Sequence, residues 1–157
     1  GAITAYSGGQ DDVGATYLSV RPGVRLLTTV YVYPRSLRPP SELQGHIDEV
    51  IREIKEYHSD AKVGETRQFT IDSRMSPLSG LAVSFESSTR LGFQNEMVTS
   101  FAYLFVRGDW FVKFRMTCPQ SELAGVHGLI DQCLRDFGWP EPNTTQQPTG
   151  APSGAGG

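Results

Sequence analysis

The amino-acid sequence predicts an α+β fold, with a mainly antiparallel sheet of about six strands and two amphipathic helices. Residues 97–118 have the pattern of two long strands joined by a tight turn. Two other segments, residues 42–58 and 121–137, repeat apolar residues at helical spacing. Because the hairpin is apolar on one face and half apolar on the other, we expect helices on both sides of the sheet, in an α/β/α sandwich.

The turn of this hairpin falls at Gly108-Asp109, and Gly at the first central position suits a type II′ turn. That turn sets the register of the two strands and places Arg107 opposite Trp110. Side chains alternate between the faces of a strand, so one face should be apolar and covered by a helix. Its six residues are Phe101, Tyr103, Phe105, Val112, Phe114 and Met116. The opposite face begins apolar and ends with two cations, Lys113 and Arg115.

The other strands are predicted from composition and turn signals. The dipeptide Pro22-Gly23 is typical of a turn between strands at 15–20 and 24–34. Two further strands, at 65–72 and 78–87, carry alternating apolar residues. With the hairpin and the two helices, the predicted element order is β-β-α-β-β-β-β-α.

The two helices are predicted from their apolar stripes and their ends. The first should run over residues 42–58, with Ser41 and Gln44 as a capping box. Its buried stripe comprises Leu43, Ile47, Val50, Ile51 and Ile54. The second should begin with Ser121 as N-cap and end before Gly138. Its buried stripe comprises Leu123, Val126, Ile130, Cys133, Leu134 and Phe137.

Composition and charge restrict the function classes. The chain has 157 residues, a formal net charge of -3 and a pI near 5.6, which argues against binding nucleic acid through bulk charge. No apolar run approaches the roughly 20 residues that a membrane-spanning helix needs. We expect a loose lead-in over 1–14, a single domain over 15–139 and a disordered tail over 140–157.

The first residue bears on localisation. The chain opens on Gly1 instead of Met, which is not a native translation start. We therefore expect that a signal peptide was removed and that the protein is periplasmic or otherwise exported. A trimmed cytoplasmic protein is the alternative.

The sequence offers no catalytic or metal-binding pattern. His46, His58 and His127 are scattered, none at metal-ligand spacing, and each is expected to be a surface or edge histidine. Cys118 and Cys133 should lie roughly 20 Å apart along the second helix, whereas a disulfide needs Cα atoms within about 4–7 Å. We therefore expect no enzymatic activity, no cofactor, no metal and no disulfide.

Two groups of residues are candidates for contact with a partner. Arg107 and Trp110 stand at the hairpin tip, where an exposed aromatic residue could anchor another protein. The sequence favours the alternative that Trp110 folds back over Arg107 as a cation–π pair.

The second group is an aromatic and basic cluster that could bind a peptide or an anionic ligand. It consists of Tyr31, Tyr33, Arg35 and Arg38. Here an ordinary strand followed by a solvated loop is the favoured alternative.

The order of elements, and the strand WFVKFRMTCP that runs into the last helix, resemble the Mog1/PsbP/DcrB-like families. The resemblance covers roughly residues 15–139 and is one of topology, without a diagnostic motif. It implies an α/β/α sandwich that is usually non-enzymatic. Members include photosystem extrinsic subunits, a nuclear-transport cofactor, bacterial periplasmic or lipid-anchored proteins and secretion adaptors. No functional residue carries over from these families.

Three functions remain open after the sequence analysis. The first is a non-catalytic accessory domain of an exported bacterial protein, whose partner is another protein. The second is a small-ligand-binding or enzyme domain with a cleft between a helix and the sheet. A pocket of convergent polar groups with shifted pKa values is required by the second and not expected by the first. The third is a cytosolic adaptor that cradles an apolar helix of a partner, which requires a large exposed apolar strip on the sheet.

Overall fold

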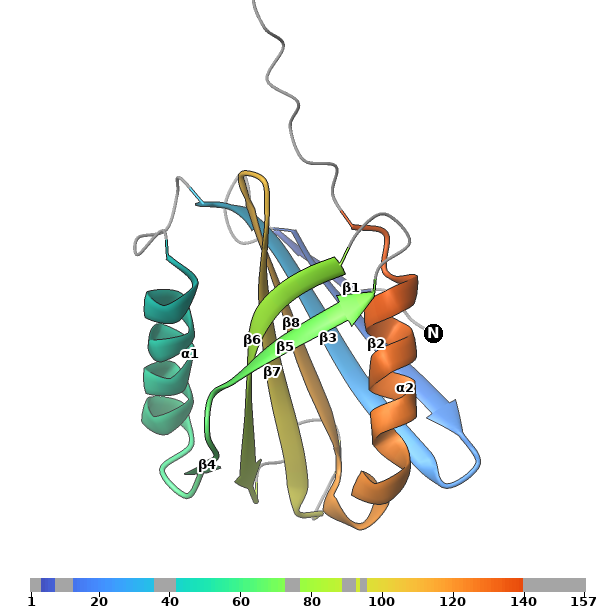
Figure 1. Cartoon of the computed structure of the whole chain (residues 1–157). Helices are drawn as coiled ribbons and strands as arrows, with labels where there is room; N and C mark the ends of the chain where they lie inside the picture. The colour runs from blue at the N-terminus through green and yellow to red at the C-terminus, as the bar shows by residue number, and fades with distance from the viewer. Residues whose placement is uncertain are drawn as a thin grey trace, which may run out of the picture.

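The structure is a computed structural model, and it describes residues 4–7, 13–35, 42–72, 77–88, 93 and 96–139. Arg38, Ser41 and the predicted tail at 140–157 lie outside the described residues. Within the described part, all strands belong to one sheet (Figure 1). The strands are β1 (Thr4–Ser7), β2 (Val13–Arg21), β3 (Val24–Pro34), β4 (Lys62–Val63), β5 (Arg67–Asp72), β6 (Pro77–Ser87), β7 (Val98–Arg107) and β8 (Trp110–Pro119).

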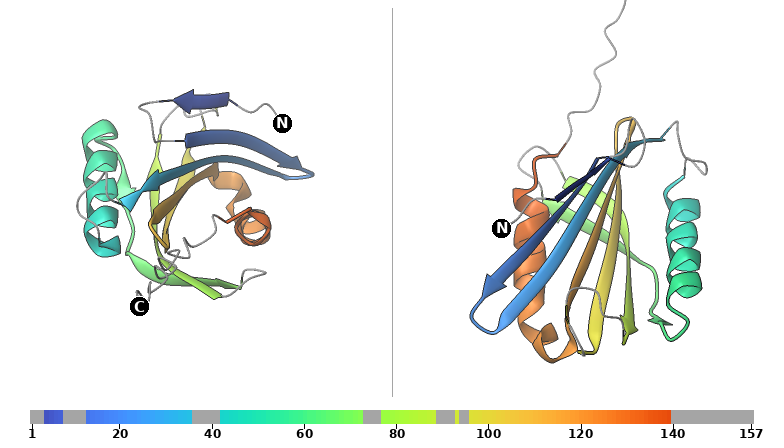
Figure 2. Two further views of the ribbon diagram at one scale, coloured as in Figure 1. Left: turned by 90° about the horizontal axis from the view of Figure 1, so that it is seen from above. Right: turned by 180° about the vertical axis from the view of Figure 1, so that it is seen from behind.

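The strand order confirms the predicted antiparallel α+β fold. The sheet runs β1-β2-β3-β8-β7-β6-β4, with β5 also paired to β6, and every described pairing is antiparallel. The predicted element order did not count the two shortest strands, β1 and β4. The expected loose lead-in over 1–14 instead holds β1 and the start of β2. Helices α1 (Leu43–Tyr57) and α2 (Leu123–Asp136) complete the fold. The sheet curls around α2, so α2 lies on its concave side and α1 on its convex side (Figure 2).

The β7–β8 hairpin has the predicted register. Arg107 pairs with Trp110, and Phe101 pairs with Met116 at the other end of the ladder. Gly108 has a φ of 57°, the left-handed conformation that the first central position of such a turn requires. The predicted apolar face therefore exists as one surface, and all six of its residues belong to the core beneath α2.

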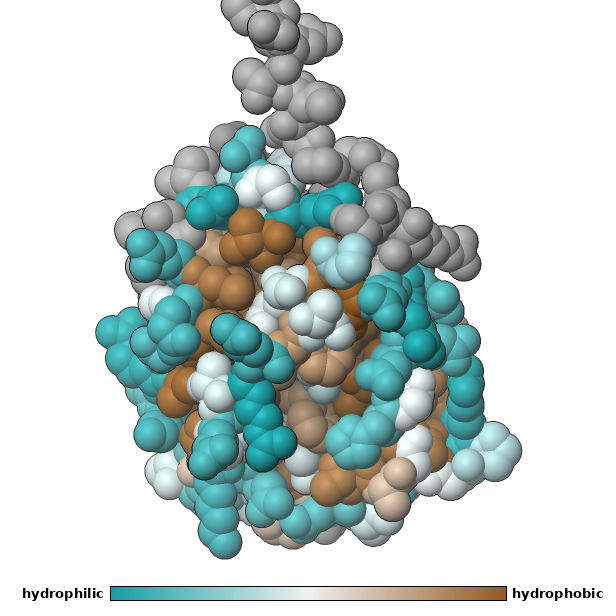
Figure 3. Space-filling model, viewed as in Figure 1, coloured by the Kyte–Doolittle hydropathy of each residue, from teal (hydrophilic) through white to brown (hydrophobic). Residues whose placement is uncertain are grey.

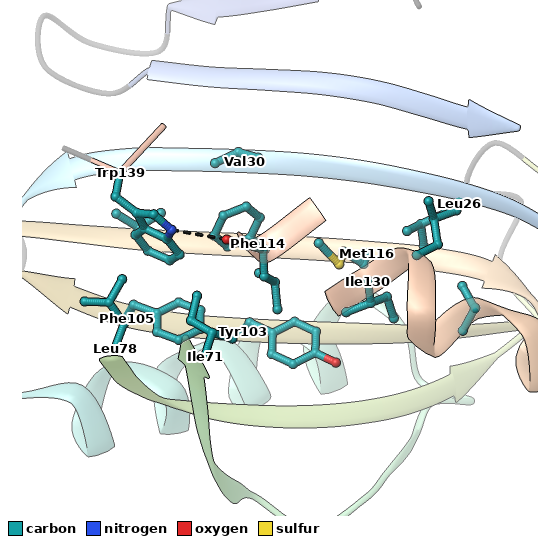
Figure 4. Close-up of a cluster of buried hydrophobic side chains, with 14 of the residues drawn as sticks. Leu26, Val30, Ile71, Leu78, Tyr103, Phe105, Phe114, Met116, Ile130 and Trp139 are labelled. Atoms are coloured by element: carbon teal, nitrogen blue, oxygen red, sulfur yellow. Dashed lines mark hydrogen bonds between the residues drawn. The ribbon is translucent and has the colours of Figure 1, made fainter. Parts of the chain in front are cut away.

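The core beneath α2 is closed by Trp139, a residue that the sequence analysis did not use. Its ring packs edge-on against Phe105, with centroids 5.0 Å apart, and also contacts Phe114 and Phe137. The indole N–H donates a hydrogen bond to the carbonyl oxygen of Leu134, so the buried polar group is satisfied (Figure 4). This segment after α2 therefore belongs to the folded domain.

The opposite face of the hairpin meets α1. Leu104, Phe111 and Ala102 are buried there with the stripe of α1 formed by Ile47, Val50 and Ile54. This second core is smaller than the first, because α1 contacts mainly β6 and β7 and leaves part of the β3–β8 surface uncovered. The two cores place the helices in separate layers, as the sandwich prediction required.

The helix starts differ from the predicted ones. Glu42, and not Ser41, takes the N-cap position of α1, without a side-chain cap hydrogen bond, and the side-chain amide of Gln44 donates to Asp48. The predicted N-cap Ser121 lies inside a short 3₁₀ turn, Gln120–Glu122, that precedes α2. Glu122 takes the N-cap position of α2, and its carboxylate accepts hydrogen bonds from the backbone N–H and the guanidinium of Arg25 instead of capping the helix.

Candidate functional site

A cleft of about 210 Å³ lies between α1 and the uncovered part of the sheet. It forms because α1 ends at Tyr57, beside the strands that the helix does not cover. Residues from α1, β3, β6, β7 and β8, with His58 just past α1, line it. They are Tyr31, Val50, Glu53, Ile54, Tyr57, His58, Phe85, Ala102, Lys113 and Arg115.

Strand alternation places two cations in this cleft. Lys113 and Arg115 follow Phe111 at two-residue spacing on β8, so all three point to the α1 side of the sheet. Register pairs Lys113 with Tyr31 of β3, and the ammonium nitrogen lies 4.7 Å from the centroid of that ring. This distance corresponds to a cation–π contact, which holds the lysine against the sheet.

Arg115 lies deeper and makes few polar contacts. Its guanidinium carbon lies 5.3 Å from the centroid of the Phe85 ring. One Nη donates to the imidazole Nε2 of His58 at 3.4 Å, a long hydrogen bond. The buried Nε–H has no hydrogen-bond partner, and no carboxylate within the described part of the chain forms an ion pair with Arg115. Burial lowers the pKa of Arg115, yet an arginine stays charged at any ordinary pH.

His58 is the titratable group of the cleft. Burial lowers its pKa below the usual 6.5, the positive charge of Arg115 lowers it further, and Asp60 opposes the shift. Asp60 is itself fixed, because its carboxylate accepts hydrogen bonds from the backbone N–H and the hydroxyl of Ser88. The imidazole is therefore neutral at pH 7, with Nε2 as the acceptor that faces Arg115.

Of the predicted aromatic and basic cluster, Tyr31 lines the cleft and Tyr33 does not. Tyr33 is buried, and its hydroxyl is hydrogen-bonded to Nε2 of His46. The expectation that His46 is a surface or edge histidine was wrong, since it is 3% exposed and stacks on Phe111 with 4.6 Å between ring centroids. Its position on the edge of the apolar stripe of α1, beside Ile47, is the signal that could have indicated burial.

The remaining predicted residues do not join the cleft. Arg35 packs over Phe111 and donates to the carbonyl oxygen of Gly108, so it binds the end of β3 to the hairpin turn. Arg107 and Trp110 pair at the hairpin tip, on the face that α2 covers further along. The structure thus separates the predicted residues onto two faces of the sheet. Arg115 and His58, which the prediction omitted, form the deeper part of the site.

Three other hollows among the described residues lack an excess of positive charge. One of about 230 Å³ has an excess of one negative charge, since Asp72 and Asp131 line it with Arg135. Two of about 320 and 330 Å³ share Gly64, Ser84 and Phe101 near β4 and β5. Each places one carboxylate with one lysine or arginine among its lining residues, Lys62 with Glu86 and Glu65 with Arg67. Figure 3 shows the side between the two helices, where apolar residues are interrupted by hydrophilic ones. The cleft beside α1 is therefore the strongest candidate for an anionic ligand.

Reactive thiols and metal ligands do not gather in the described residues. Cys118 and Cys133 are both free, and burial raises the pKa of Cys118 to about 11. No group of three His, Cys, Asp or Glu residues in the described ranges is placed to hold a metal ion. None of the described helices has the length and apolar character to cross a membrane.

No protein-family model matches this sequence, and no curated protein matches it at a significant level. The fold is similar to the crystal structure of "Protein of Unknown Function PA94" from Pseudomonas aeruginosa, with a TM-score of 0.60. That similarity covers 90% of this chain and 99% of the other, at 10% sequence identity. At this identity the likeness shows the fold alone. The resemblance to the Mog1/PsbP/DcrB-like families stays a prediction.

Proposed function

We propose that this chain is a non-catalytic binding domain that holds a small anionic ligand in the cleft between α1 and the sheet. One observation carries the proposal: Lys113 and Arg115 converge there with His58 and Tyr31 over a buried apolar floor. Clefts with apolar walls and a few convergent polar groups are the usual form of small-ligand sites. The pKa values of Arg115 and His58 are shifted, as expected for groups in a site partly removed from water.

Binding without catalysis fits the residue types in the cleft. Among its described lining residues there is no serine, threonine or cysteine that could act as a nucleophile. The buried cysteine Cys118 lies on the end of β8, and its raised pKa disfavours the reactive thiolate. The cleft instead offers positive charge, hydrogen-bond donors and aromatic surface, which suit recognition.

A thermal-shift screen tests this proposal. Compounds of negative, zero and positive charge are added to the protein, since a ligand that binds the folded state raises its melting temperature. The Lys113→Glu variant reverses one charge in the cleft. The Lys55→Glu variant makes the same change on the exposed side of α1. We expect anions to stabilise the wild type and Lys55→Glu but not Lys113→Glu. An absence of any stabilising compound, or equal stabilisation of both variants, contradicts the proposal.

A second candidate is the accessory role in an exported bacterial protein that the sequence predicts, with another protein as partner. The observation that favours it is apolar exposure near the end of β2, where Leu18 is 50% and Val20 is 65% exposed. Alternation and register place both on the same face of the sheet as the cleft. Site-specific photo-crosslinking at Val20, with exposed Glu56 of α1 as control, tests it. Crosslinks to one protein at Val20 alone support the role, and equal crosslinking at both positions contradicts it.

A further inference from the structure

The charges that line the cleft favour a ligand with a single negative charge. Lys113 and Arg115 supply two positive charges, Glu53 supplies one negative charge, and His58 is neutral at pH 7. The described lining thus has an excess of one positive charge. A monoanion neutralises that excess, whereas a dianion such as phosphate places additional negative charge near Glu53.

The contacts of Arg115 favour a carboxylate as the charged group. One nitrogen of the guanidinium already donates to His58, and the ring of Phe85 lies against the guanidinium. The buried Nε–H lacks an acceptor within the described residues. A carboxylate is planar and accepts hydrogen bonds from a guanidinium in its own plane, so it can supply the missing acceptor.

The floor of the cleft favours an apolar body on the ligand. Val50, Ile54, Phe85 and Ala102 line it, and each is buried against its neighbours. An anion without an apolar part would leave this surface in contact with water. The cleft, at about 210 Å³, is smaller than the roughly 300–1,000 Å³ of sites for drug-sized ligands. The apolar body should therefore be one ring or a short chain.

We infer that the ligand of this cleft is a small monocarboxylic acid with a single aromatic ring or a short apolar chain. The carboxylate binds Lys113 and the free donor of Arg115, and the apolar body lies on Phe85 and Ala102 between the sheet and α1. This inference rests on the proposed function, because it names the chemical class of the ligand at the same site.

Titrations followed by backbone and side-chain NMR test the inference with four probes. Benzoate and hexanoate represent the proposed class, and benzamide is the neutral isostere of benzoate. Inorganic phosphate, titrated at a pH above its second pKa, represents the dianion. We expect benzoate and hexanoate to shift signals of His58, Ala102 and Tyr31, with dissociation constants in the millimolar range that suits so few ligand atoms. Benzamide and phosphate should bind at least tenfold more weakly.

Variants assign the effect to the cleft. Lys113→Met should weaken benzoate binding at least fivefold, and Lys55→Met should leave it unchanged. Lys113 is only half-buried, so its replacement is not expected to prevent folding. Arg115→Met should weaken benzoate binding more than Lys113→Met does. The amide spectrum reports whether the Arg115→Met variant is folded.

The outcomes separate the ligand class from the proposed function. If phosphate shifts the cleft signals and the carboxylates do not, the ligand class is wrong while the anion site stands. Equal binding of benzamide and benzoate would also reject a carboxylate-specific site. If none of the four probes shifts a cleft residue, both the inference and the proposed function are contradicted.

Discussion

A guanidinium nitrogen of Arg115 lies 3.4 Å from Nε2 of His58, although 57 residues separate them in the chain. Arginine can only donate, so the imidazole accepts and must be neutral on that nitrogen. A proton on His58 would replace this hydrogen bond with repulsion between two cations. The contact therefore makes both stability and ligand binding sensitive to pH.

The first prediction concerns stability below neutral pH. The pKa of His58 is lower in the folded protein than in the unfolded chain, where it is near 6.5. Between these two values the unfolded chain binds more protons, so the free energy of unfolding falls as the pH falls. His58→Gln should remove this part of the pH dependence. Urea unfolding at several pH values measures it, and an equal slope in the variant and the wild type would contradict the prediction.

The second prediction concerns ligand binding by the same histidine. An anion beside Arg115 stabilises the protonated imidazole, so benzoate should raise the pKa of His58. By linkage, benzoate should bind more tightly at pH 5.5 than at pH 7.5. Benzoate itself stays ionised at both of these pH values, so the change reports on the protein. NMR titration of the imidazole signals measures both effects. The signals of His127, which is exposed on α2, should not respond to benzoate.

The third prediction compares two glycines. Gly80 lies in β6 opposite Phe105, and an added Cβ would approach the carbonyl oxygen of Leu104 to 2.4 Å. Gly80→Ala should therefore destabilise the fold by about 1–3 kcal/mol, as overpacking does. Gly128 lies in α2 with open space around it, so Gly128→Ala should stabilise by about 0.4–1 kcal/mol. Chemical denaturation measures both, and effects of the same sign would contradict the prediction.

The fourth prediction concerns the residue that closes the core beneath α2. Trp139→Ala removes the contacts with Phe105, Phe114 and Phe137 and should cost about 3–5 kcal/mol. Trp139→Phe keeps much of the aromatic contact and loses the hydrogen bond to Leu134, so its cost should be smaller. Thermal unfolding of both variants tests this ranking. A loss below 1 kcal/mol for Trp139→Ala would mean that this segment is not part of the cooperative fold.

The fifth prediction concerns the buried pair Tyr33 and His46. Tyr33→Phe removes the hydroxyl and leaves His46 Nε2 without that partner in a buried site, which should cost about 1–3 kcal/mol. Tyr17 is 39% exposed on β2 and provides the matched control. Tyr17→Phe should change stability by no more than about 0.5 kcal/mol. Equal effects of the two substitutions in urea unfolding would contradict the prediction.

The sequence by itself determined the hairpin register, the apolar stripes of both helices and the α+β class. Each follows from a local pattern: the two-residue alternation of a strand, the 3.6-residue period of a helix, or a turn glycine such as Gly108. Lys113 and Arg115 were correctly placed on the half-apolar face by the same alternation. Their convergence with a histidine was not predicted, because alternation says nothing about what approaches the face.

Only the tertiary structure decided which side chains meet across the fold. His58 reaches Arg115 because α1 crosses the convex face and ends beside β8. His46 is buried because Tyr33 supplies its hydrogen bond, and the Glu122 side chain does not cap α2 because Arg25 binds it. These contacts join residues far apart in the chain, and their free energy depends on packing and desolvation that no local spacing records. The cleft is therefore a property of how the layers pack, and the sequence pattern alone could indicate only its two cations.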